Sequence, residues 1–390
     1  MSQKSTHITD LFGTLPTPSY IIDENVLRRN GEILASVAAH TGCKILLAQK
    51  AFSNYDFYPL LSGYLSGTEA SGLYEARLGA EEMPDKEVHV FCGAYRDDEF
   101  EELLTYADHI VFNSPHQFKK FAQKAKAAGK SIGLRINPEC STQDGHAIYD
   151  PCAPGSRLGT TRAVWNREMT GEWISLLDGL HFHTLCEQDS DDLETTLAAV
   201  ERSFGDILPQ MKWLNMGGGH HITRNDYDIA RLEKCITYAQ DQWNLCVYLE
   251  PGEAVALNAG YLITRVLDIV ENNGTHIAIL DTSAACHMPD VLEMPYRPPL
   301  RSSGMPEEKK YTYRLSSYTC LAGDIIGDYS FDEEKKVDDR LYFEDMAIYS
   351  MVKNNTFNGI PLPDIAVMDE SGECKVIRSF SYDDFKGRLS

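Results

Sequence analysis

Short apolar segments that alternate with helix-like segments set the strongest limit on how this chain can fold. Eight of them recur between residues 44 and 252, and in order they read KILLAQ, GTEASG, EVHVFCG, HIVFN, SIGLRIN, GLHFHTL, WLNMGGG and CVYLEPG. Stretches between them, such as residues 116–129 and 191–208, carry apolar residues three and four positions apart, which is typical of helices. Strands alternating with helices pair in parallel, and eight repeats are the number that closes a (β/α)8 barrel. GTEASG is a poor strand by propensity, so its inclusion depends on its spacing.

The pattern changes after residue 255, where strand-like segments follow one another without intervening helices. YLITRVLDIVENN, THIAILDTS and YTYRLSSYTC are separated by turn signals such as NNG, which favours an antiparallel β domain. SYIIDEN, near residue 19, is a further strand that can join this sheet. The sequence therefore predicts an α/β protein. An N-terminal segment over 1–40 contributes to the β domain, a TIM-like barrel spans 41–255, and the C-terminal antiparallel β domain spans 256–390.

The overall composition argues against several classes of protein. Hydrophobic residues make up 43% of the chain, but no run reaches the ~20 apolar residues that a membrane helix needs. The first residues, MSQKSTHITDLFG, lack the apolar core of a secretory signal, so we expect a cytoplasmic protein without a membrane partner. The formal charge of -22 would repel nucleic acid and is compatible with a cationic substrate or simply with solubility. The ten cysteines form no CxxC pair, which argues against a zinc ribbon or a disulfide framework.

A lysine follows the first strand of the expected barrel. Reactive groups in such a barrel lie at the carboxyl ends of the strands, where the loops form the open mouth, and Lys50 comes directly after KILLAQ. A lysine partly desolvated by apolar neighbours has a lowered pKa and can attack a carbonyl to form a Schiff base. The alternative is a lysine whose ammonium group simply extends from the strand end into water.

Three further strand ends carry groups that could bind a ligand or take part in catalysis. His181 and His183 share one face of the sixth strand, and without an evident third ligand a stacking or structural role is favoured over a metal site. Three glycines follow the seventh strand, where they form either a phosphate cradle of backbone amides or only a tight turn. Glu250 ends the eighth strand, where a buried carboxylate needs a cation or a proton donor such as a protonated pyridine nitrogen. Together with Lys50, these groups describe pyridoxal 5'-phosphate as the ligand, although none of them does so alone.

On these residues the chain resembles the barrel-type pyridoxal-phosphate decarboxylases, the family that contains ornithine, arginine and diaminopimelate decarboxylases. The resemblance runs nearly end to end, from LPTPSYIIDE to FEDMAIYSMVKNNTFNG. It implies that Lys50 binds the cofactor as a Schiff base, that His183 stacks on the ring, and that Glu250 meets the ring nitrogen. The full cofactor-binding set that it implies is Lys50, Glu69, Arg135, His183, Gly217, Gly218, Gly219, Glu250 and Tyr349.

The resemblance also implies that the β domain completes the active site. The cysteine of YTCLAGD, Cys320, matches one that reaches the neighbouring subunit's site, which makes it a proton-donor candidate beside the catalytic Lys50 and His183. Tyr349 matches a tyrosine that contacts the phosphate, and Phe357 one that lines the site. A homodimer with two shared active sites is the partner that this implies.

Departures from the family pattern bear on the substrate, which the resemblance implies to be a cationic amino acid. Glu253 stands where ornithine decarboxylases carry an arginine, and Leu321 where diaminopimelate decarboxylases carry a glutamate; Cys186 replaces a serine that relatives often place near the phosphate. These differences favour a longer polycation, carboxynorspermidine or carboxyspermidine, whose decarboxylation yields norspermidine or spermidine. The predicted substrate-binding residues are Glu253, Asp281, Asp290, Asp324 and Phe357, and each carboxylate among them could instead be a solvated loop residue.

Other functions stay open on sequence alone. The substrate could be diaminopimelate or ornithine, or the chain could be a non-catalytic regulator with the same fold, although the presence of Lys50, Glu250 and Cys320 argues against a regulator. A pyridoxal-phosphate carrier built on the barrel alone would not need the residues after 255. A racemase would need a tyrosine base, for which no convincing position is found.

Overall fold

The computed structural model describes residues 12–143 and 147–390 of the chain. Two compact units make it up: Arg28–Val255, and the described residues up to Leu27 together with Ala256–Ser390. The division after Val255 coincides with the expected one, but the other lies after Leu27 rather than at residue 40. The reason is that helix α2 (Glu24–Thr41) packs on the barrel, where Asn30 Nδ2 donates to the carbonyl of Val255 (3.2 Å).

The larger unit is a closed barrel of eight parallel strands, and all eight segments expected from the sequence form strands in it. Strand β10 closes the ring by pairing with β2, and the short strand β7 is added to β6 outside the ring. The strands are β2 (Lys44–Ala48), β3 (Gly67–Ala70), β4 (Glu87–Phe91), β5 (His109–Phe112), β6 (Ser131–Asn137), β7 (Thr160–Thr161), β8 (Gly179–His181), β9 (Trp213–Asn215) and β10 (Cys246–Leu249).

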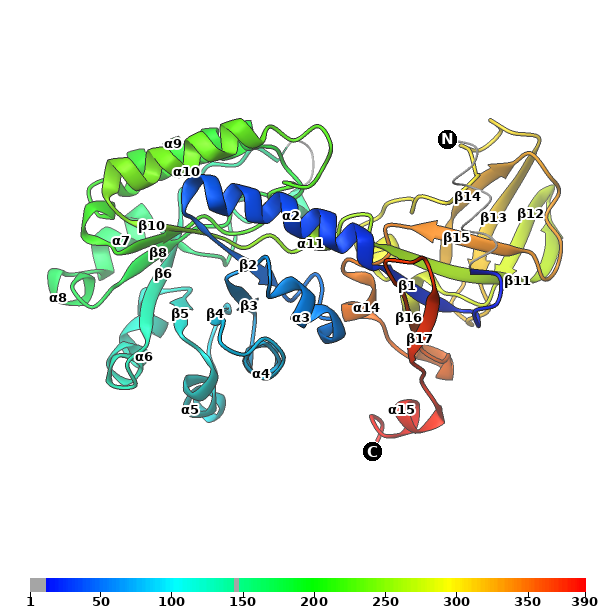
Figure 1. Cartoon of the computed structure of the whole chain (residues 1–390), viewed down its shortest axis with the longest axis horizontal. Coiled ribbons are helices and arrows are strands. Elements are labelled where there is room, and N and C mark those ends of the chain that lie inside the picture. The colour runs from blue at the N-terminus through cyan, green and yellow to red at the C-terminus, as the bar shows by residue number, and fades with distance from the viewer. Residues whose placement is uncertain (1–11, 144–146) are drawn as a thin grey trace. The chain divides into compact units, whose positions relative to one another are not determined.

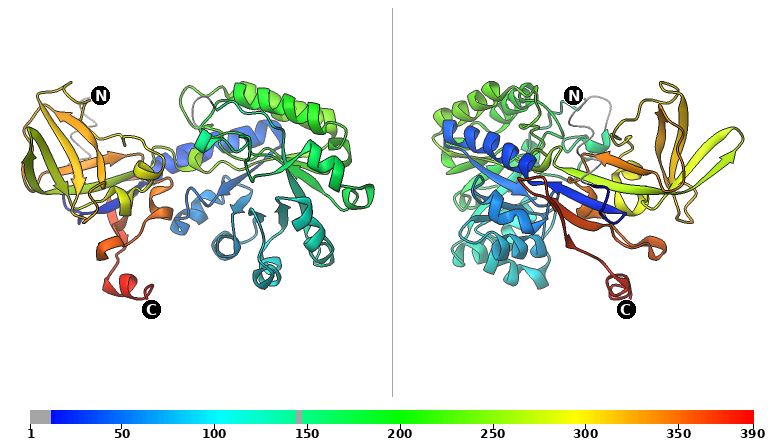
Figure 2. Two further views of the ribbon diagram at one scale, coloured as in Figure 1. Left: turned by 180° about the vertical axis from the view of Figure 1, so that it is seen from behind. Right: turned by 45° about the vertical axis from the view of Figure 1, so that its right-hand side comes forward.

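Helices surround the barrel strands, as Figures 1 and 2 show from three sides. They are α3 (Tyr58–Leu61), α4 (Leu73–Glu82), α5 (Asp97–Tyr106), α6 (Pro115–Ala127), α7 (Arg162–Glu168), α8 (Gly171–Ile174), α9 (Ser190–Phe204), α10 (Ile229–Trp243) and α11 (Glu253–Ala256). Several begin at a sequence-encoded cap; for example, the Ser114 hydroxyl accepts from the Gln117 amide at the start of α6, where Pro115 fixes the first turn.

The least strand-like segment of the barrel is held by its neighbours. Strand β3, with the sequence GTEA, is buried along its whole length and pairs in parallel with both β2 and β4. In this register Glu69 lies opposite Ala48 on one side and His89 on the other. Backbone pairing on two sides therefore outweighs the poor propensity of these residues, and it places the Glu69 carboxyl near the carboxyl ends of the strands.

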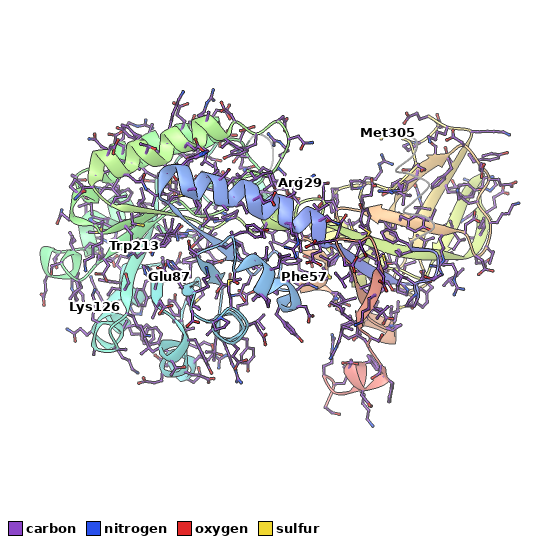
Figure 3. The ribbon with its side chains drawn as sticks, viewed as in Figure 1. Arg29, Phe57, Glu87, Lys126, Trp213 and Met305 are labelled. Carbon is purple, nitrogen blue, oxygen red and sulfur yellow. The ribbon has the colours of Figure 1, made fainter. Side chains whose placement is uncertain are left out.

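The barrel interior is filled by side chains in two kinds of layer. Leu46, Val111, Trp213 and Tyr248 form an apolar cluster among the barrel strands. Such apolar residues are expected because the strands of a parallel barrel are buried on both faces. Polar residues that begin strands lie at the amino-terminal end: Lys44 pairs with Glu87, and Glu87 also contacts His89 Nε2 at 3.1 Å. Figure 3 labels Trp213 and Glu87 within this unit.

The second unit is an eight-stranded sheet of mixed direction. Its order is β14-β13-β12-β11-β1-β16-β17, with β15 paired to β11. The strands are β1 (Ser19–Asp23), β11 (Gly260–Asn272), β12 (Thr275–Leu280), β13 (Tyr311–Ser317), β14 (Ile325–Phe331), β15 (Arg340–Glu344), β16 (Asp364–Met368) and β17 (Cys374–Arg378). The short helices of this unit are α12 (Ala284–His287), α13 (Asp290–Glu293), α14 (Ser350–Lys353) and α15 (Tyr382–Lys386).

The expected N-terminal strand does join this sheet, since β1 lies between β11 and β16. The antiparallel β domain expected from the sequence is present, with two parallel pairings within it: β1 pairs with β16 in parallel, and β12 pairs with β13 in parallel. The long connection that contains α12 and α13 lets the chain return in the same direction between β12 and β13. Within the described residues, none of the helices has both the length and the apolar character that crossing a membrane requires.

Candidate active site

A cavity of about 240 Å³ opens at the carboxyl ends of the barrel strands. Six of the residues that the sequence singled out line it, namely Lys50, Glu69, Arg135, His181, His183 and Glu250. The other lining residues are Ala48, Ser71, Phe91, Cys92, Gly93, Arg157 and Leu158. Several charged groups of both signs thus face one small space, which is the usual arrangement of an enzyme active site rather than of a structural core.

Lys50 follows β2 and is exposed toward this space. Of the two possibilities that the sequence left open for Lys50, its exposure favours a lysine that extends into water over one surrounded by apolar groups. The residues around it are largely polar or charged, because strands β3, β6, β8 and β10 all end in such groups. Its amine is accessible to an incoming aldehyde, which is the requirement for covalent capture.

Glu250 is an ionised carboxylate at the floor of the cavity. It is 4% exposed and is contacted by His181 Nε2 at 3.1 Å and by the amide group of Asn215. Burial opposes ionisation, but His181 and the Asn215 hydrogen bond outweigh it and lower the pKa of Glu250. Burial keeps the pKa of His181 low, so its neutral ring donates from Nε2 to the carboxylate.

Glu69 takes the opposite protonation state. It is 3% exposed, and its Oε2 atom has no hydrogen-bond partner among the described residues. Burial and the nearby charge of Glu250 raise the pKa of Glu69 well above its ordinary value. Because Glu250 has two donors and Glu69 Oε2 has none in the described part of the chain, Glu69 is the one of these two carboxyl groups that retains a proton.

Arg135 and His183 form one wall of the cavity. The Arg135 guanidinium lies 4.6 Å from the Phe91 ring centre and donates to the carbonyl of His183 at 3.2 Å. Burial lowers the pKa of Arg135 to about 10, which leaves it charged at neutral pH. His183 Nδ1 accepts from the Gly218 amide at 3.1 Å, and burial lowers the pKa of His183 well below its ordinary value. The ring is therefore neutral, with its proton on Nε2.

The three glycines form a tight loop behind His183 and Glu250. Gly217 and Gly219 have φ angles of 71° and 81°, which favour glycine, and a Cβ on Gly218 would lie 2.4 Å from the carbonyl oxygen of Glu250. In the described part of the chain, the amides of Gly219 and His220 donate to no protein acceptor. Two free amides at a left-handed turn are suited to hold a phosphate. The loop supplies none of the cavity's lining residues, but it contacts two of them.

These residues fit pyridoxal 5'-phosphate. Lys50 offers an accessible amine for the aldehyde, Glu250 is a carboxylate suited to a protonated ring nitrogen, and His183 is a neutral ring suited to stacking. The glycine loop offers amides for the phosphate.

Comparison with known proteins identifies the family. The model of the pyridoxal-dependent decarboxylases, described by their C-terminal sheet domain, matches residues 19–347. The chain belongs to the pyridoxal-dependent decarboxylases. It is therefore an enzyme whose cofactor is pyridoxal 5'-phosphate, as the resemblance in the sequence implied.

Two relatives and one solved structure are similar to this chain over nearly its whole length. A carboxynorspermidine/carboxyspermidine decarboxylase of Campylobacter jejuni is 42% identical over 96% of this chain and 98% of its own. A carboxyaminopropylagmatine decarboxylase of Synechocystis is 41% identical over 96% of both chains. The crystal structure of carboxynorspermidine decarboxylase from Campylobacter jejuni with norspermidine superimposes with a TM-score of 0.88, at 41% identity, over 96% of this chain and 100% of that one.

The second unit of this decarboxylase gathers three of the predicted residues, Cys320, Asp324 and Phe357. Cys320 is exposed, and its amide donates to Asn358 Oδ1 at 2.9 Å, next to the half-exposed Phe357. Asp324 is 1% exposed and accepts four hydrogen bonds from its own unit. These come from the hydroxyls of Ser283, Ser317 and Thr319 and from the amide of Ala285, at 2.6, 2.8, 2.7 and 3.2 Å.

The other predicted carboxylates of this unit also have partners. Asp281 accepts from the hydroxyls of Thr17 and Thr264, at 2.6 and 2.7 Å, and Asp290 pairs with Lys353. A substrate amine would have to displace one of these donors, so the contacts disfavour the predicted roles of Asp281, Asp290 and Asp324, which stay predictions. Tyr349 adopts a left-handed backbone conformation with φ 56° before α14, and its predicted phosphate contact also stays a prediction.

Sequence reasoning missed several lining residues. Arg157 and Leu158 come from the long loop between β6 and β7, which is held by Asn113: its Nδ2 donates to the carbonyl of Arg157, and its Oδ1 accepts from Gly159, both at 2.8 Å. No strand end signals this loop. Cys92 and Gly93 do follow a strand directly, in EVHVFCG, and could have been found by the rule that identified Lys50.

Proposed function

We propose that this decarboxylase converts carboxynorspermidine and carboxyspermidine into norspermidine and spermidine. The observation that supports this most is the end-to-end similarity, 42% identical, to an enzyme named for both substrates. A second carboxynorspermidine/carboxyspermidine decarboxylase, from Herminiimonas arsenicoxydans, is 36% identical over 96% of this chain and 100% of its own. The diaminopimelate decarboxylases are more distant, at 24% for the Haemophilus influenzae enzyme, which makes diaminopimelate a weaker candidate.

In this proposal each cavity residue has a role that its environment supports. Lys50 would hold the cofactor through its aldehyde group. Glu250, held ionised by His181 and Asn215, keeps the ring nitrogen protonated. The bound cofactor supplies the chemistry by accepting the electron pair that decarboxylation leaves behind. His183 covers the ring, and Cys320 returns a proton to the substrate carbon.

A second candidate substrate deserves equal testing, because the Synechocystis relative is 41% identical and is named for carboxyaminopropylagmatine. That compound ends in a planar guanidinium, whereas carboxynorspermidine ends in a primary ammonium. The two groups need different partners, since a guanidinium is best bound by two parallel hydrogen bonds to one carboxylate.

We include in the proposal a cytoplasmic homodimer whose active sites are shared. Tyr318, Leu321 and Phe357 are each more than 40% exposed around Cys320, an apolar surface that a second copy would cover. All ten cysteines are free, which suits the reducing cytoplasm.

The deciding experiment is a substrate panel. Purified holoenzyme is incubated with carboxynorspermidine, carboxyspermidine, carboxyaminopropylagmatine, ornithine and diaminopimelate, and released carbon dioxide and amine product are measured. The proposal predicts the highest kcat/KM for the first two. A higher value for carboxyaminopropylagmatine would establish the second candidate, and turnover of ornithine or diaminopimelate alone would refute both.

A further inference from the structure

A histidine–glutamate contact joins two loops at the barrel mouth and has no role in the chemistry above. His221 Nε2 lies 3.3 Å from an oxygen of Glu253, and the two side chains are 12% and 18% exposed. His221 comes two residues after Gly219, and Glu253 begins α11 after β10. Because β9 and β10 are neighbours in the barrel, the contact bridges adjacent βα loops.

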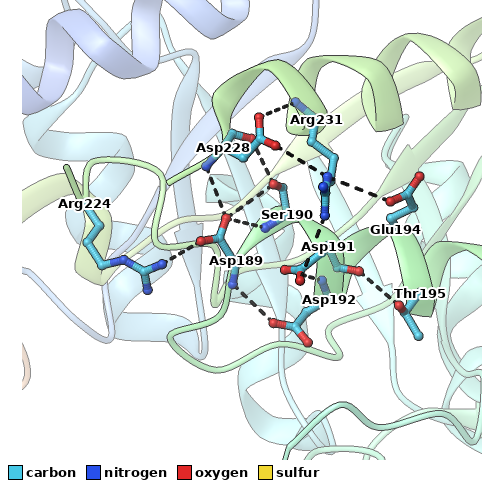
Figure 4. Close-up of polar contacts among 9 residues, drawn as sticks. All are labelled: Asp189, Ser190, Asp191, Asp192, Glu194, Thr195, Arg224, Asp228 and Arg231. Atoms are coloured by element: carbon cyan, nitrogen blue, oxygen red, sulfur yellow. Dashed lines mark hydrogen bonds and ion pairs between the residues drawn. The ribbon is translucent and has the colours of Figure 1, made fainter. Parts of the chain in front are cut away.

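This contact borders the glycine loop, whose free amides suit an anion. The segment is fixed in place by Gln188: its amide donates to the Gly219 carbonyl at 3.0 Å, and its carbonyl accepts from the His221 amide at 3.2 Å. Farther along, Arg224 pairs at 2.6 Å with Asp189, the residue that caps α9 (Figure 4). The position of His221 beside the loop is therefore set by backbone hydrogen bonds to Gln188 and by the Arg224–Asp189 ion pair.

The imidazole of His221 still has hydrogen-bonding capacity. Both ring nitrogens are buried, and neither has an aligned hydrogen-bond partner among the described residues, since the Glu253 contact is an ion-pair contact only. Burial disfavours the charged ring, but Glu253 outweighs burial and raises the pKa of His221. Glu187 acts in the same direction, Arg224 acts against it, and Asp226 also faces the ring.

We propose that His221 neutralises Glu253 so that the glycine loop can accept the phosphate dianion of the cofactor. A bare carboxylate beside the loop would repel a phosphate, whereas an imidazolium–carboxylate pair has no net charge and can still donate N–H groups. The inference deepens the proposed function and rests on it for the bound cofactor. It assigns Glu253 to the phosphate side of the site, not to a substrate amine.

The test compares pyridoxal phosphate with pyridoxal, which lacks the phosphate. The full chain is freed of cofactor, and both compounds are titrated by absorbance into the unmodified enzyme, His221→Gln, Glu253→Gln and the double variant. His221→Gln should weaken pyridoxal phosphate about tenfold, because one carboxylate near the phosphate is left unbalanced, and should leave pyridoxal unchanged. The double variant should return to within about threefold of the unmodified enzyme, because the unbalanced charge is gone.

The pH dependence gives an independent measurement. His221 loses its proton as the pH rises through its raised pKa, so in the unmodified enzyme the affinity ratio of pyridoxal phosphate to pyridoxal should fall at a pH above the ordinary histidine pKa of about 6.5. The same ratio should stay flat in His221→Gln. Circular dichroism verifies folding, and His221→Asn serves as a second variant if His221→Gln fails to fold.

Three outcomes would overturn the inference. Equal losses for both compounds in His221→Gln, without recovery in the double variant, would make His221 merely structural. A Glu253→Gln variant that loses substrate affinity but binds both pyridoxal phosphate and pyridoxal as the unmodified enzyme does would assign Glu253 to the substrate amine. Unmodified enzyme that binds neither compound would overturn the proposed function as well, which distinguishes that failure from the first two.

Discussion

Two carboxyl groups in one cavity are driven to opposite protonation states by their neighbours. Glu250 has two donors, from His181 and Asn215, whereas Glu69 has an oxygen without a partner among the described residues. The ionised group is suited to a protonated ring nitrogen, and the neutral one can donate a hydrogen bond to a ligand. The protonation state of each carboxyl group in this cavity thus depends on residues from other strands.

Glu250→Gln removes the charge that keeps the ring nitrogen protonated. We expect kcat to fall about a hundredfold, the magnitude typical of losing one preorganised electrostatic group, with cofactor content retained. Steady-state kinetics and the absorbance of the bound cofactor check this. Glu172→Gln, at an exposed position in α8, is the matched control and should have normal kcat. Normal turnover by Glu250→Gln would contradict the role given to this carboxylate.

The site residues that could be predicted from the sequence are those at the carboxyl end of a barrel strand, because that position places a residue at the barrel mouth. Lys50, His183 and Glu250 follow short apolar strands, and all three line the cavity. Asn215 and Arg157 could not be found in this way. The role of Asn215 depends on the pairing of β9 with β10, and Arg157 reaches the site from a loop whose path is set by Asn113.

Among the elements, the barrel was predictable because its strands are buried on both faces and read as continuous apolar runs. Strand β3 was predicted only from its spacing between the neighbouring apolar segments. It forms because it pairs with β2 on one side and with β4 on the other. The mixed direction of the second sheet was not predictable, because alternation within a strand does not reveal whether its neighbour is parallel. The glycine loop is the element on which cofactor binding depends most.

Gly218→Ala tests that loop. Its Cβ would meet the Glu250 carbonyl at 2.4 Å, so the loop must shift. We expect about a tenfold loss of cofactor affinity and a destabilisation of about 1–3 kcal/mol from overpacking. Gly171→Ala is the control, because a Cβ there meets no neighbouring atom within 4 Å. Unchanged cofactor affinity in Gly218→Ala would show that the loop does not hold the phosphate.

Glu87, at the amino-terminal end of β4, should make stability depend on pH. Burial opposes its ionisation, but His89 and Lys44 outweigh burial and lower the pKa of Glu87 to about 2. Because the pKa is lower in the folded state, ionised Glu87 stabilises the protein at pH values above the unfolded-state pKa of about 4.3. This stabilisation is lost as the pH falls toward the folded-state pKa. Glu87→Gln should therefore cost about 2 kcal/mol at pH 7. Urea unfolding at several pH values should show this difference shrinking below about pH 4, and a constant difference would contradict the assignment.

At the scale of the whole molecule, the predicted catalytic groups are divided between two units. Lys50 and Glu250 belong to the barrel, whereas Cys320 belongs to the sheet unit, in a turn held by the four hydrogen bonds of Asp324. If the enzyme is a homodimer with shared sites, one subunit supplies the lysine and the other the cysteine.

Mixing two inactive variants tests this division. Lys50→Ala and Cys320→Ala should each be nearly inactive as homodimers. After unfolding and refolding together in equal amounts, half of the dimers should be mixed, each with one intact site, and activity should recover to about a quarter of the normal value. Separately refolded variants are the control. Absence of recovery would show that lysine and cysteine of one site come from the same subunit.

The proposed reaction depends above all on a covalent bond between the Lys50 amine and the cofactor aldehyde. Holoenzyme is reduced with borohydride, digested, and mapped by mass spectrometry, with Lys50→Arg treated in parallel. We expect a pyridoxyl-phosphate label on the peptide that contains Lys50 and no label in the variant. A label on another lysine, or none in the unmodified enzyme, would contradict it.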